Sequence, residues 1–223
     1  MIDLSEHVIV LDLDDTLYLE RDYARSGFAA VGRWAQAEHD IDGLADCCLA
    51  LFEAGVRGTI FDRALQSLGV DSQSIAIARL VEIYRSHMPR ITLADDAARL
   101  MRRVRGIPTA LITDGPLACQ SNKVTALDLQ RRIGKVILTA ALPAGCGKPH
   151  PLAFAQVEQW SGKAPSSHVY IADNLAKDFV APRKRGWLTV QIARPGRIHQ
   201  GEAPTAAHAA VHAIDTLDEI ILR

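Results

Sequence analysis

The stretch from Val8 to Leu17 constrains the fold of this chain more than any other part of its sequence. It reads VIVLDLDDTL, so four apolar residues run directly into two carboxylates that are separated by one residue. A short apolar run of this kind is typical of a strand that is covered on both faces, as in a parallel sheet. Because alternate residues of a strand point to the same side, we expect Asp12 and Asp14 to lie together.

The position of these two acids also bears on function. In open parallel sheets, ligands bind beyond the carboxyl ends of the strands, and Asp12 and Asp14 come at such an end. Two acids held together there predict a nucleophile, a proton-transfer group and a metal site. A strand-to-helix turn capped by carboxylates would give the same short pattern, so other residues must separate the two interpretations.

Length and charge exclude several classes of protein. A chain of 223 residues forms one or two domains, and its net charge of -1 gives no electrostatic case for binding nucleic acid or a membrane surface. No apolar stretch approaches the length of a membrane span, and no basic segment followed by an apolar one opens the chain. The four cysteines lack the paired spacing of a metal site, which predicts reduced thiols in a cytoplasmic protein. The oligomeric state is left open.

The pattern of apolar residues predicts two domains. Residues 18 to about 88 show helical spacing punctuated by glycines, which indicates three or four short helices. After Pro89, helices and strands alternate. The expected strands are 107–112, 136–138, 168–172, 188–192 and a tail strand near 209–211, and the expected helices are near 95–105, 116–127, 150–160, 175–185 and 217–222. Such alternation predicts an α/β core with a Rossmann-like, doubly wound parallel sheet, formed by residues 1–17 and 89–223, into which an all-helical domain of residues 18–88 is inserted.

Three further polar clusters follow expected strands. Thr113, Asp114 and Gly115 come after an apolar run, and Lys148 lies in the loop before the helix near residue 150. The third cluster contains the acidic pair Asp173 and Asp178. Each cluster alone could be a helix cap or a solvated loop charge, but their order along one sheet edge favours a site.

Taken together, these motifs resemble the haloacid dehalogenase-like (HAD) hydrolase superfamily, specifically its phosphatases with a helical cap inserted after the first motif. The family pattern is Asp-x-Asp-x-Thr, then Ser or Thr after a strand, then Lys, then an acidic pair after another strand. The matching residues of this chain are Asp12, Asp14, Thr16, Thr113, Lys148, Asp173 and Asp178. The resemblance extends from residue 8 to about residue 192.

The resemblance implies a Mg²⁺-dependent phosphohydrolase. Asp12 would attack phosphorus to form an aspartyl-phosphate, and Asp14 would protonate the leaving oxygen and later take a proton from water. The Mg²⁺ ion would be held by Asp12, Asp173 and the backbone carbonyl of Asp14, and Asp178 would support it.

The remaining motif residues are expected to bind the phosphate. Lys148 would offset negative charge, while the Thr113 hydroxyl and the amides of Asp114 and Gly115 would contact the phosphate at a helix N-terminus. A closing cap leaves little room for a protein, so the expected partner is a small phosphorylated metabolite. Arg57, which lies in a loop between two glycines of the cap, is our candidate for binding an anionic or hydroxylated part of the substrate, and a solvated side chain is an equal alternative.

The same residues bear on other activities. A phosphomutase shares these motifs, and a catalytically silent binding module is a further alternative. Asp14 argues against dehalogenation, since a halide leaving group needs no proton. The absence of lysine from residues 18–88 argues against phosphonate cleavage through a cap Schiff base. The order of the motifs argues against a response-regulator receiver domain.

Overall fold

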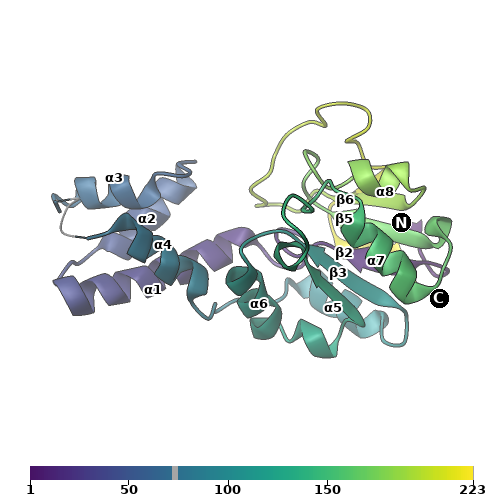
Figure 1. Cartoon of the computed structure of the whole chain (residues 1–223), viewed down its shortest axis with the longest axis horizontal. Helices are drawn as coiled ribbons and strands as arrows, with labels where there is room; N and C mark the ends of the chain where they lie inside the picture. Colours follow the sequence, from purple (N-terminus) through teal and green to yellow (C-terminus); the bar gives the residue numbers. More distant parts are fainter. Residues whose placement is uncertain (72–74, 223) are drawn as a thin grey trace. The chain divides into compact units, whose positions relative to one another are not determined.

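The structure is a computed structural model, and it describes residues 1–71 and 75–222 (Figure 1). The chain divides into two compact units. One, which we call the α/β unit, comprises Met1–Glu20 and Thr92–Arg223, and the other, the helical unit, comprises Arg21–Ile91. The sequence placed these divisions after residues 17 and 88. That the helical unit acts as a cap stays a prediction.

Aromatic rings pack against one another in the core of the helical unit. Its helices are α1 (Glu20–His39), α2 (Leu44–Glu53), α3 (Ile60–Ser67) and α4 (Ile77–Ser86). The Phe28 ring meets the rings of Phe52 and Phe61 edge-on, with centroids 5.9 and 6.1 Å apart. The Tyr23 hydroxyl donates a hydrogen bond of 2.9 Å to the Tyr84 carbonyl, which ties α1 to α4. None of the helices that the structure describes is both long enough and apolar enough to cross a bilayer.

The α/β unit contains the predicted parallel sheet. Its six strands are β2 (Val8–Leu11), β3 (Thr109–Thr113), β4 (Lys135–Leu138), β5 (His168–Ala172), β6 (Leu188–Ile192) and β7 (His212–Ile214). They are arranged in the order β4-β3-β2-β5-β6-β7, and every pair is parallel. Strand β2 lies inside the sheet between β3 and β5, and all four of its residues are buried, as expected for a strand that is covered on both faces.

Helices cover both faces of this sheet, which confirms the doubly wound fold. They are α5 (Asp95–Arg103), α6 (Leu117–Ala126), α7 (Leu152–Ser161) and α8 (Val180–Lys184), with short 3-10 turns η1 (Leu129–Arg131), η2 (Thr139–Ala141), η3 (Pro165–Ser167) and η4 (Leu217–Glu219). The chain runs outward from β2 to β3 and β4 and then returns to β5 and β6. Right-handed crossovers consequently place α5 and α6 on one face and α7 and α8 on the other (Figure 1).

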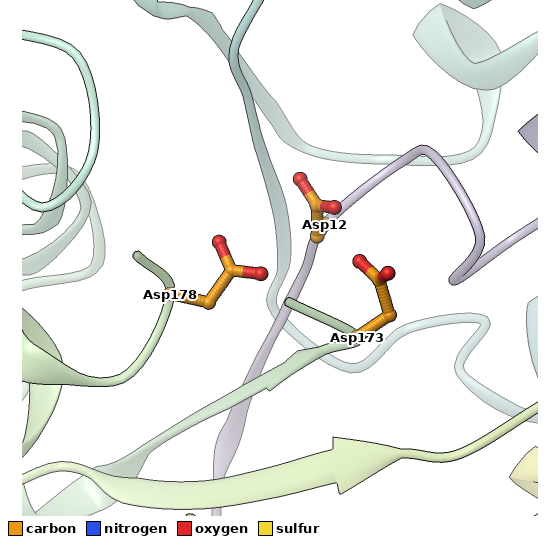
Figure 2. A group of neighbouring side chains, drawn as sticks. All are labelled: Asp12, Asp173 and Asp178. Carbon is orange, nitrogen blue, oxygen red and sulfur yellow. The ribbon is translucent and has the colours of Figure 1, made fainter. Parts of the chain in front are cut away.

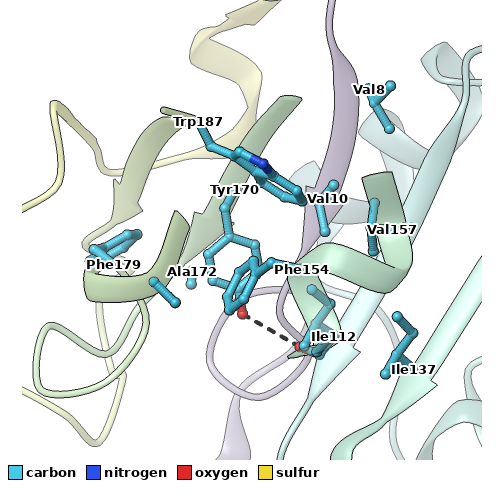
Figure 3. Packing of buried hydrophobic residues seen from close by; sticks show 13 residues of the cluster. Val8, Val10, Ile112, Ile137, Phe154, Val157, Tyr170, Ala172, Phe179 and Trp187 are labelled. Carbon is cyan, nitrogen blue, oxygen red and sulfur yellow. Dashed lines mark hydrogen bonds between the residues drawn. The ribbon is translucent and has the colours of Figure 1, made fainter. Parts of the chain in front are cut away.

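The core under α7 and α8 fixes the strands that carry the candidate site (Figure 3). The Phe154 ring packs edge-on against Tyr170 and Trp187, with centroids 5.1 and 5.4 Å apart. The Tyr170 hydroxyl donates a hydrogen bond of 3.4 Å to the Ile112 carbonyl. This bond links the middle of β5 to the carboxyl-terminal part of β3, on the other side of β2.

The helix predicted for 175–185 is wrong in its first half, because the α-helix in this range, α8, begins at Val180. The preceding segment is a turn in which the Asn174 carbonyl accepts from the Asp178 amide at 3.0 Å. The Asp178 carboxylate in return accepts from the Asn174 amide at 2.9 Å. Such local bonds from Asn and Asp side chains compete with helix formation.

The tail also differs from the prediction. The strand expected at 209–211 is β7, three residues later, and the helix expected at 217–222 is only the 3-10 turn η4. Thr216 and Glu219 form a capping box around that turn. The chain then continues as β8 (Ile220–Ile221), which pairs in parallel with β1 (Ile2–Asp3), so tertiary pairing of β-branched residues overrides the helix.

Candidate active site

The carboxyl ends of three neighbouring strands bring the predicted motifs to one edge of the sheet. Asp12 follows β2, Thr113 ends β3, and Asp173 follows β5. The register is locked there, since the Asp12 amide donates a 2.9 Å hydrogen bond to the Ile171 carbonyl. A cavity of about 140 Å³ opens at this edge, and its lining residues are Asp12, Asp14, Glu20, Asp114, Asp173, Asn174, Lys177 and His199.

Three buried carboxylates meet at this edge. Asp12, Asp173 and Asp178 each contribute an oxygen, and these oxygens all lie within 4.8 Å of one another. Figure 2 shows the three side chains directed toward a common space. Burial, followed by the charges of Asp12 and Asp178, raises the pKa of Asp173 to about 9. One Asp173 oxygen, Oδ2, is buried and has no hydrogen-bond partner within the described part of the chain.

The donor set of this cluster fits a hard divalent cation. Clustered buried carboxylates repel one another unless a positive charge lies among them, and an orphaned buried oxygen such as Asp173 Oδ2 needs a partner. Oxygen ligands, mainly carboxylates, are what Mg²⁺ prefers. The residues present are therefore suited to holding Mg²⁺.

Lys148 supplies a fixed positive charge next to this cluster. Its Nζ donates a 2.7 Å hydrogen bond to Asp12 Oδ1 and a 3.0 Å hydrogen bond to the Tyr170 hydroxyl, and it forms a 2.7 Å ion pair with Asp178 Oδ1. Burial alone would lower the pKa of Lys148, but the charges of Asp12 and Asp178 hold it well above its ordinary value. Burial raises the pKa of Asp12 to about 6, and the Lys148 charge opposes that rise. Lys148 thus places a positive charge between the carboxylates of Asp12 and Asp178.

Asp114 fixes the loop that carries Lys148. Its Oδ1 accepts hydrogen bonds from the Thr139 hydroxyl at 2.6 Å and from the Lys148 amide at 3.2 Å. Its Oδ2 lies 3.4 Å from Lys177 Nζ. Burial acts to raise the pKa of Asp114, but the charge of Lys148 and the Thr139 hydrogen bond bring it below its ordinary value. The sequence assigned Asp114 a role through its amide, and this role of its carboxylate was not foreseen.

The Asp14 side chain lies apart from the three clustered carboxylates. Its Oδ1 accepts from Lys123 Nζ at 2.7 Å and from the Tyr18 hydroxyl, and its Oδ2 accepts from Gln120 Nε2 at 2.8 Å. Burial acts to raise the pKa of Asp14, but the charge of Lys123 and these hydrogen bonds lower it. Asp14 still lines the cavity beside Asp12, whereas the metal contact expected of it, through its backbone carbonyl, stays a prediction.

Thr113 and Gly115 both contact Gln120. The Thr113 hydroxyl, which is buried, accepts a 2.6 Å hydrogen bond from Gln120 Nε2. At Gly115, where φ is +144°, an added Cβ would lie 3.1 Å from carbons of the Gln120 side chain. The close approach of Gln120, together with this backbone conformation, explains why residue 115 is glycine.

Arg57, the cap residue expected to bind substrate, makes local contacts within the helical unit. Its Nη1 donates to the Phe52 carbonyl at 2.7 Å and to the Val56 carbonyl at 2.8 Å, and the guanidinium carbon lies 4.0 Å from the Phe52 ring centroid. The side chain therefore covers the end of α2, and its role toward a substrate stays a prediction.

Sequence reasoning missed several residues of this region. They are Glu20, Gln120, Lys123, Tyr170, Lys177 and His199. Gln120 and Lys123 are three apart on the helix that follows Thr113, so helical spacing could have placed them on one face. Tyr170 looked like an ordinary core residue of β5, and only the sheet register shows that its hydroxyl reaches Lys148. His199 comes from a long loop whose path the sequence does not indicate.

Comparison with known proteins identifies the family to which the fold belongs. A family model described as haloacid dehalogenase-like hydrolase matches residues 7–184. Among curated proteins, the chain is similar to the phosphoserine phosphatase of Thermus thermophilus. The two are 25% identical over 235 residues, which covers 88% of this chain and 92% of the relative.

Solved structures show the same fold at low sequence identity. The putative HAD-hydrolase YfnB from Bacillus subtilis, bound to magnesium, has a TM-score of 0.66 at 17% identity and covers 96% of both chains. A putative β-phosphoglucomutase from Thermotoga maritima has a TM-score of 0.65 at 19% identity, covering 98% of this chain and 96% of that chain. A 2-haloacid dehalogenase from Pseudomonas syringae pv. Tomato DC3000 has a TM-score of 0.62 at 20% identity, with the same coverage. Because the family model matches residues 7–184 of the 223 in this chain, the chain belongs to the haloacid dehalogenase-like hydrolase family.

Proposed function

We propose that this protein is a Mg²⁺-dependent phosphatase that cleaves phosphate monoesters of a small metabolite through an aspartyl-phosphate on Asp12. The observation that carries the proposal is the buried contact of Asp12 with Lys148 beside the carboxylates of Asp173 and Asp178. That arrangement would supply a nucleophile, a positive charge and a set of metal ligands within one cluster. The similarity to a phosphoserine phosphatase supports phosphate-ester chemistry without naming the substrate.

Asp12, Asp173 and the backbone carbonyl of Asp14 would hold the Mg²⁺ ion, with support from Asp178. When bound, the ion supplies positive charge that offsets the repulsion between a carboxylate and a phosphate dianion. Lys148 contributes a second positive charge and fixes one oxygen of Asp12 by a direct hydrogen bond.

Each of the two half-reactions uses Asp12 and Asp14. The Asp12 carboxylate attacks phosphorus, the ester P–O bond breaks, and Asp14 gives a proton to the leaving oxygen. Water then attacks the aspartyl-phosphate, Asp14 takes a proton from that water, and phosphate leaves as free Asp12 is restored. The Thr113 hydroxyl and the amides of Asp114 and Gly115 would bind the phosphate oxygens near the start of α6.

Two alternatives are compatible with the same residues. A phosphomutase would return the phosphoryl group to a reoriented product, and one similar structure is a putative β-phosphoglucomutase. A silent binding module would keep the fold without the reaction. The acid Asp14 on the cavity wall favours ester cleavage over dehalogenation, in which the leaving halide needs no proton.

The expected setting of the reaction is the cytoplasm. All four cysteines (Cys47, Cys48, Cys119 and Cys146) are free thiols in the structure, which fits a reducing compartment. A small phosphorylated metabolite is the expected partner, which the similarity to a phosphoserine phosphatase supports.

Phosphate release from a broad panel of phosphorylated metabolites, with and without Mg²⁺, tests the proposal. Asp12→Asn is the matched control, because the amide keeps the size of the carboxylate and removes the nucleophile. Metal-dependent release that Asp12→Asn abolishes is the expected result. Release that survives in Asp12→Asn would refute the mechanism. Activity that requires a bisphosphorylated activator would instead establish the mutase.

A further inference from the structure

Lys177 lines the cavity at the sheet edge, and the proposed reaction gives it no role. The described lining of this cavity contains five carboxylates and one lysine side chain, which is that of Lys177. A phosphate monoester is largely a dianion at neutral pH, so the carboxylates around the cavity repel it as it enters. A positive charge on the cavity wall that the substrate can reach lowers this cost.

Lys148, although it contacts Asp12, has no N–H donor left for a substrate. The ammonium group of a lysine has three donors. Two of them are taken by contacts of 2.7 Å with the carboxylates of Asp12 and Asp178, and the third by a contact of 3.0 Å with the Tyr170 hydroxyl. The Lys148 side chain is also only 1% exposed. Lys148 therefore acts on an incoming phosphate through its charge and through Asp12, without a direct hydrogen bond.

The ammonium group of Lys177 is held more weakly. Among the described residues its contact is with Asp114 Oδ2, at 3.4 Å, and 35% of the Lys177 side chain is exposed. Asp114 does not depend on this contact for its position, because its Oδ1 accepts from the Thr139 hydroxyl at 2.6 Å and from the Lys148 amide at 3.2 Å. The Lys177 ammonium can consequently turn to a ligand while Asp114 stays in place.

The backbone that carries Lys177 is fixed by the turn before α8. The Asn174 carbonyl accepts from the Lys177 amide at 3.3 Å and from the Asp178 amide at 3.0 Å. The Asn174 side chain accepts from the Ala176 amide at 2.9 Å. Such bonds from an Asn side chain and carbonyl stabilise a turn in place of a helix. Lys177 thus projects from a defined turn and reaches the cavity wall at Asp114.

We propose that Lys177 is a further substrate-binding residue, whose ammonium contacts the phosphoryl group that is transferred to Asp12. This inference rests on the proposed phosphatase function. The position of Lys177 supports it, because its ammonium lies against Asp114, whose backbone amide is proposed to bind a phosphate oxygen. A bound phosphate takes the place of the Asp114 carboxylate as the partner of Lys177, and this exchange gives the ammonium a more highly charged partner.

Binding of inorganic phosphate to the Mg²⁺-loaded protein tests this contact without turnover. In isothermal titration calorimetry, Lys177→Met should have a dissociation constant about tenfold or more above the wild-type value, because a hydrogen bond to a charged group is lost. Lys163→Met, at an exposed lysine, should bind phosphate as the wild type does. Wild-type affinity in Lys177→Met would overturn the proposal, and so would a wild type that binds no phosphate.

Asp114→Asn separates a phosphate contact from an effect that is transmitted through Asp114. If Lys177 only positions Asp114, Lys177→Met has no further effect in the Asp114→Asn background. We expect it to weaken phosphate binding there as well, again by about tenfold or more. No additional loss in the double variant would overturn the proposal. Thermal unfolding identifies any variant that does not fold. If Lys177→Met does not fold, Lys177→Gln replaces it, and if Asp114→Asn does not fold, the single variants decide.

The outcomes for Lys177 and for the proposed function can be told apart. Mg²⁺-dependent phosphate release together with unchanged phosphate binding in Lys177→Met would leave the phosphatase standing and overturn the contact. No release from any compound, together with weakened phosphate binding in Lys177→Met, would refute the phosphatase and support the contact. A KM that rises only for substrates with an anionic leaving group, with phosphate binding unchanged, would assign Lys177 to that leaving group and overturn the proposal.

Discussion

The ammonium of Lys148 lies 2.7 Å from a carboxylate oxygen of Asp12, although 136 residues separate the two in the sequence. The pair is almost completely enclosed, with side-chain exposures of 1% and 7%. A charge pair in such surroundings interacts more strongly than it would in water, and loss of one partner leaves the other uncompensated.

Replacement of Lys148 is therefore expected to impair both activity and stability. Lys148→Met should lower kcat for phosphate release by about 10²–10³-fold, the usual effect of removing a preorganised charge from a catalytic site. It should also lower the free energy of unfolding by about 3–5 kcal/mol, because Asp12 and Asp178 lose their shared cation. Phosphate-release assays and urea unfolding measure the two effects.

Lys148→Arg should impair turnover as well, since a planar guanidinium does not fit where a compact ammonium contacts two carboxylates and Tyr170. Lys163→Arg, at an exposed lysine, is the matched control. Turnover near the wild-type level in Lys148→Arg would contradict the role assigned to Lys148.

The raised pKa of Asp173 predicts how stability depends on pH in the absence of metal. The folded protein holds a proton on Asp173 up to about pH 9, whereas the unfolded chain releases it near the ordinary value of 3.8. The unfolded state thus binds fewer protons over this window, and stability falls as pH rises through it. Asp173→Asn removes this effect and should raise the metal-free melting temperature at pH 8, by about 2–4 °C for each kcal/mol.

With Mg²⁺ present, the wild type should have a higher melting temperature than Asp173→Asn. A ligand that binds only the folded state raises its stability, so Mg²⁺ should raise the melting temperature of the wild type more than that of Asp173→Asn. Thermal unfolding with and without Mg²⁺ measures both shifts. An equal shift in the two proteins would exclude Asp173 from the metal site.

The buried ion pair between Asp96 and Arg194 predicts that stability depends on pH in the opposite direction. Asp96 Oδ1 accepts from Arg194 at 2.7 Å and its Oδ2 accepts from the Leu217 amide at 2.8 Å. Burial acts to raise the pKa of Asp96, but these partners lower it below its ordinary value. The stability that this ionised carboxylate contributes is complete above the ordinary pKa and is lost as pH falls through the lowered one.

Asp96→Asn should therefore cost about 3–5 kcal/mol at pH 7, as expected for breaking a buried ion pair, and clearly less at pH 3. Urea unfolding at the two pH values tests this, with the exposed neighbour Asp95→Asn as control. A loss of the same size at both pH values would show that the charge of Asp96 is not responsible.

Asp15 holds a loop that contributes to the cavity. Its φ of +52° is in the left-handed region, and its carboxylate accepts from the amides of Glu20 at 2.8 Å and Ile198 at 2.7 Å. Asp15→Gly keeps the backbone conformation without strain and loses both bonds, so we expect hydrogen exchange in residues 194–200 to accelerate. Asp40→Gly, at another aspartate with a positive φ of 53°, should leave that exchange unchanged. Unaltered exchange in Asp15→Gly would show that other contacts hold the loop.

Arg57→Ala separates a substrate contact from local packing. If the guanidinium binds substrate, KM for the best substrate should rise, whereas a purely local role should lower only stability, by about 1 kcal/mol for the lost hydrogen bonds to the end of α2. Arg63→Ala, at an exposed arginine of α3, is the control. An unchanged KM would refute the hypothesis that Arg57 contacts the substrate.

Local sequence patterns determined most of the sheet and the motif residues. Strands β5 and β6 have the predicted bounds of 168–172 and 188–192, and β2 is buried along its whole length, as its unbroken VIVL segment predicted. The division into helical and α/β segments followed from the change of hydrophobic period, which is a property of neighbouring residues. Asp12, Thr113 and Asp173 could be found because each directly follows or ends such a strand.

Tertiary structure alone decided how those residues are held. Only the packing of α6 against the rest of the α/β unit brings Lys123 and Gln120 onto Asp14, since a helix sequence does not say which distant group its buried face will meet. The same limit explains the tail, where Ile220 and Ile221 pair with β1 instead of continuing a helix. Periodicity is encoded by residues a few positions apart, whereas hydrogen bonds and ion pairs between distant segments form only when the whole chain has packed.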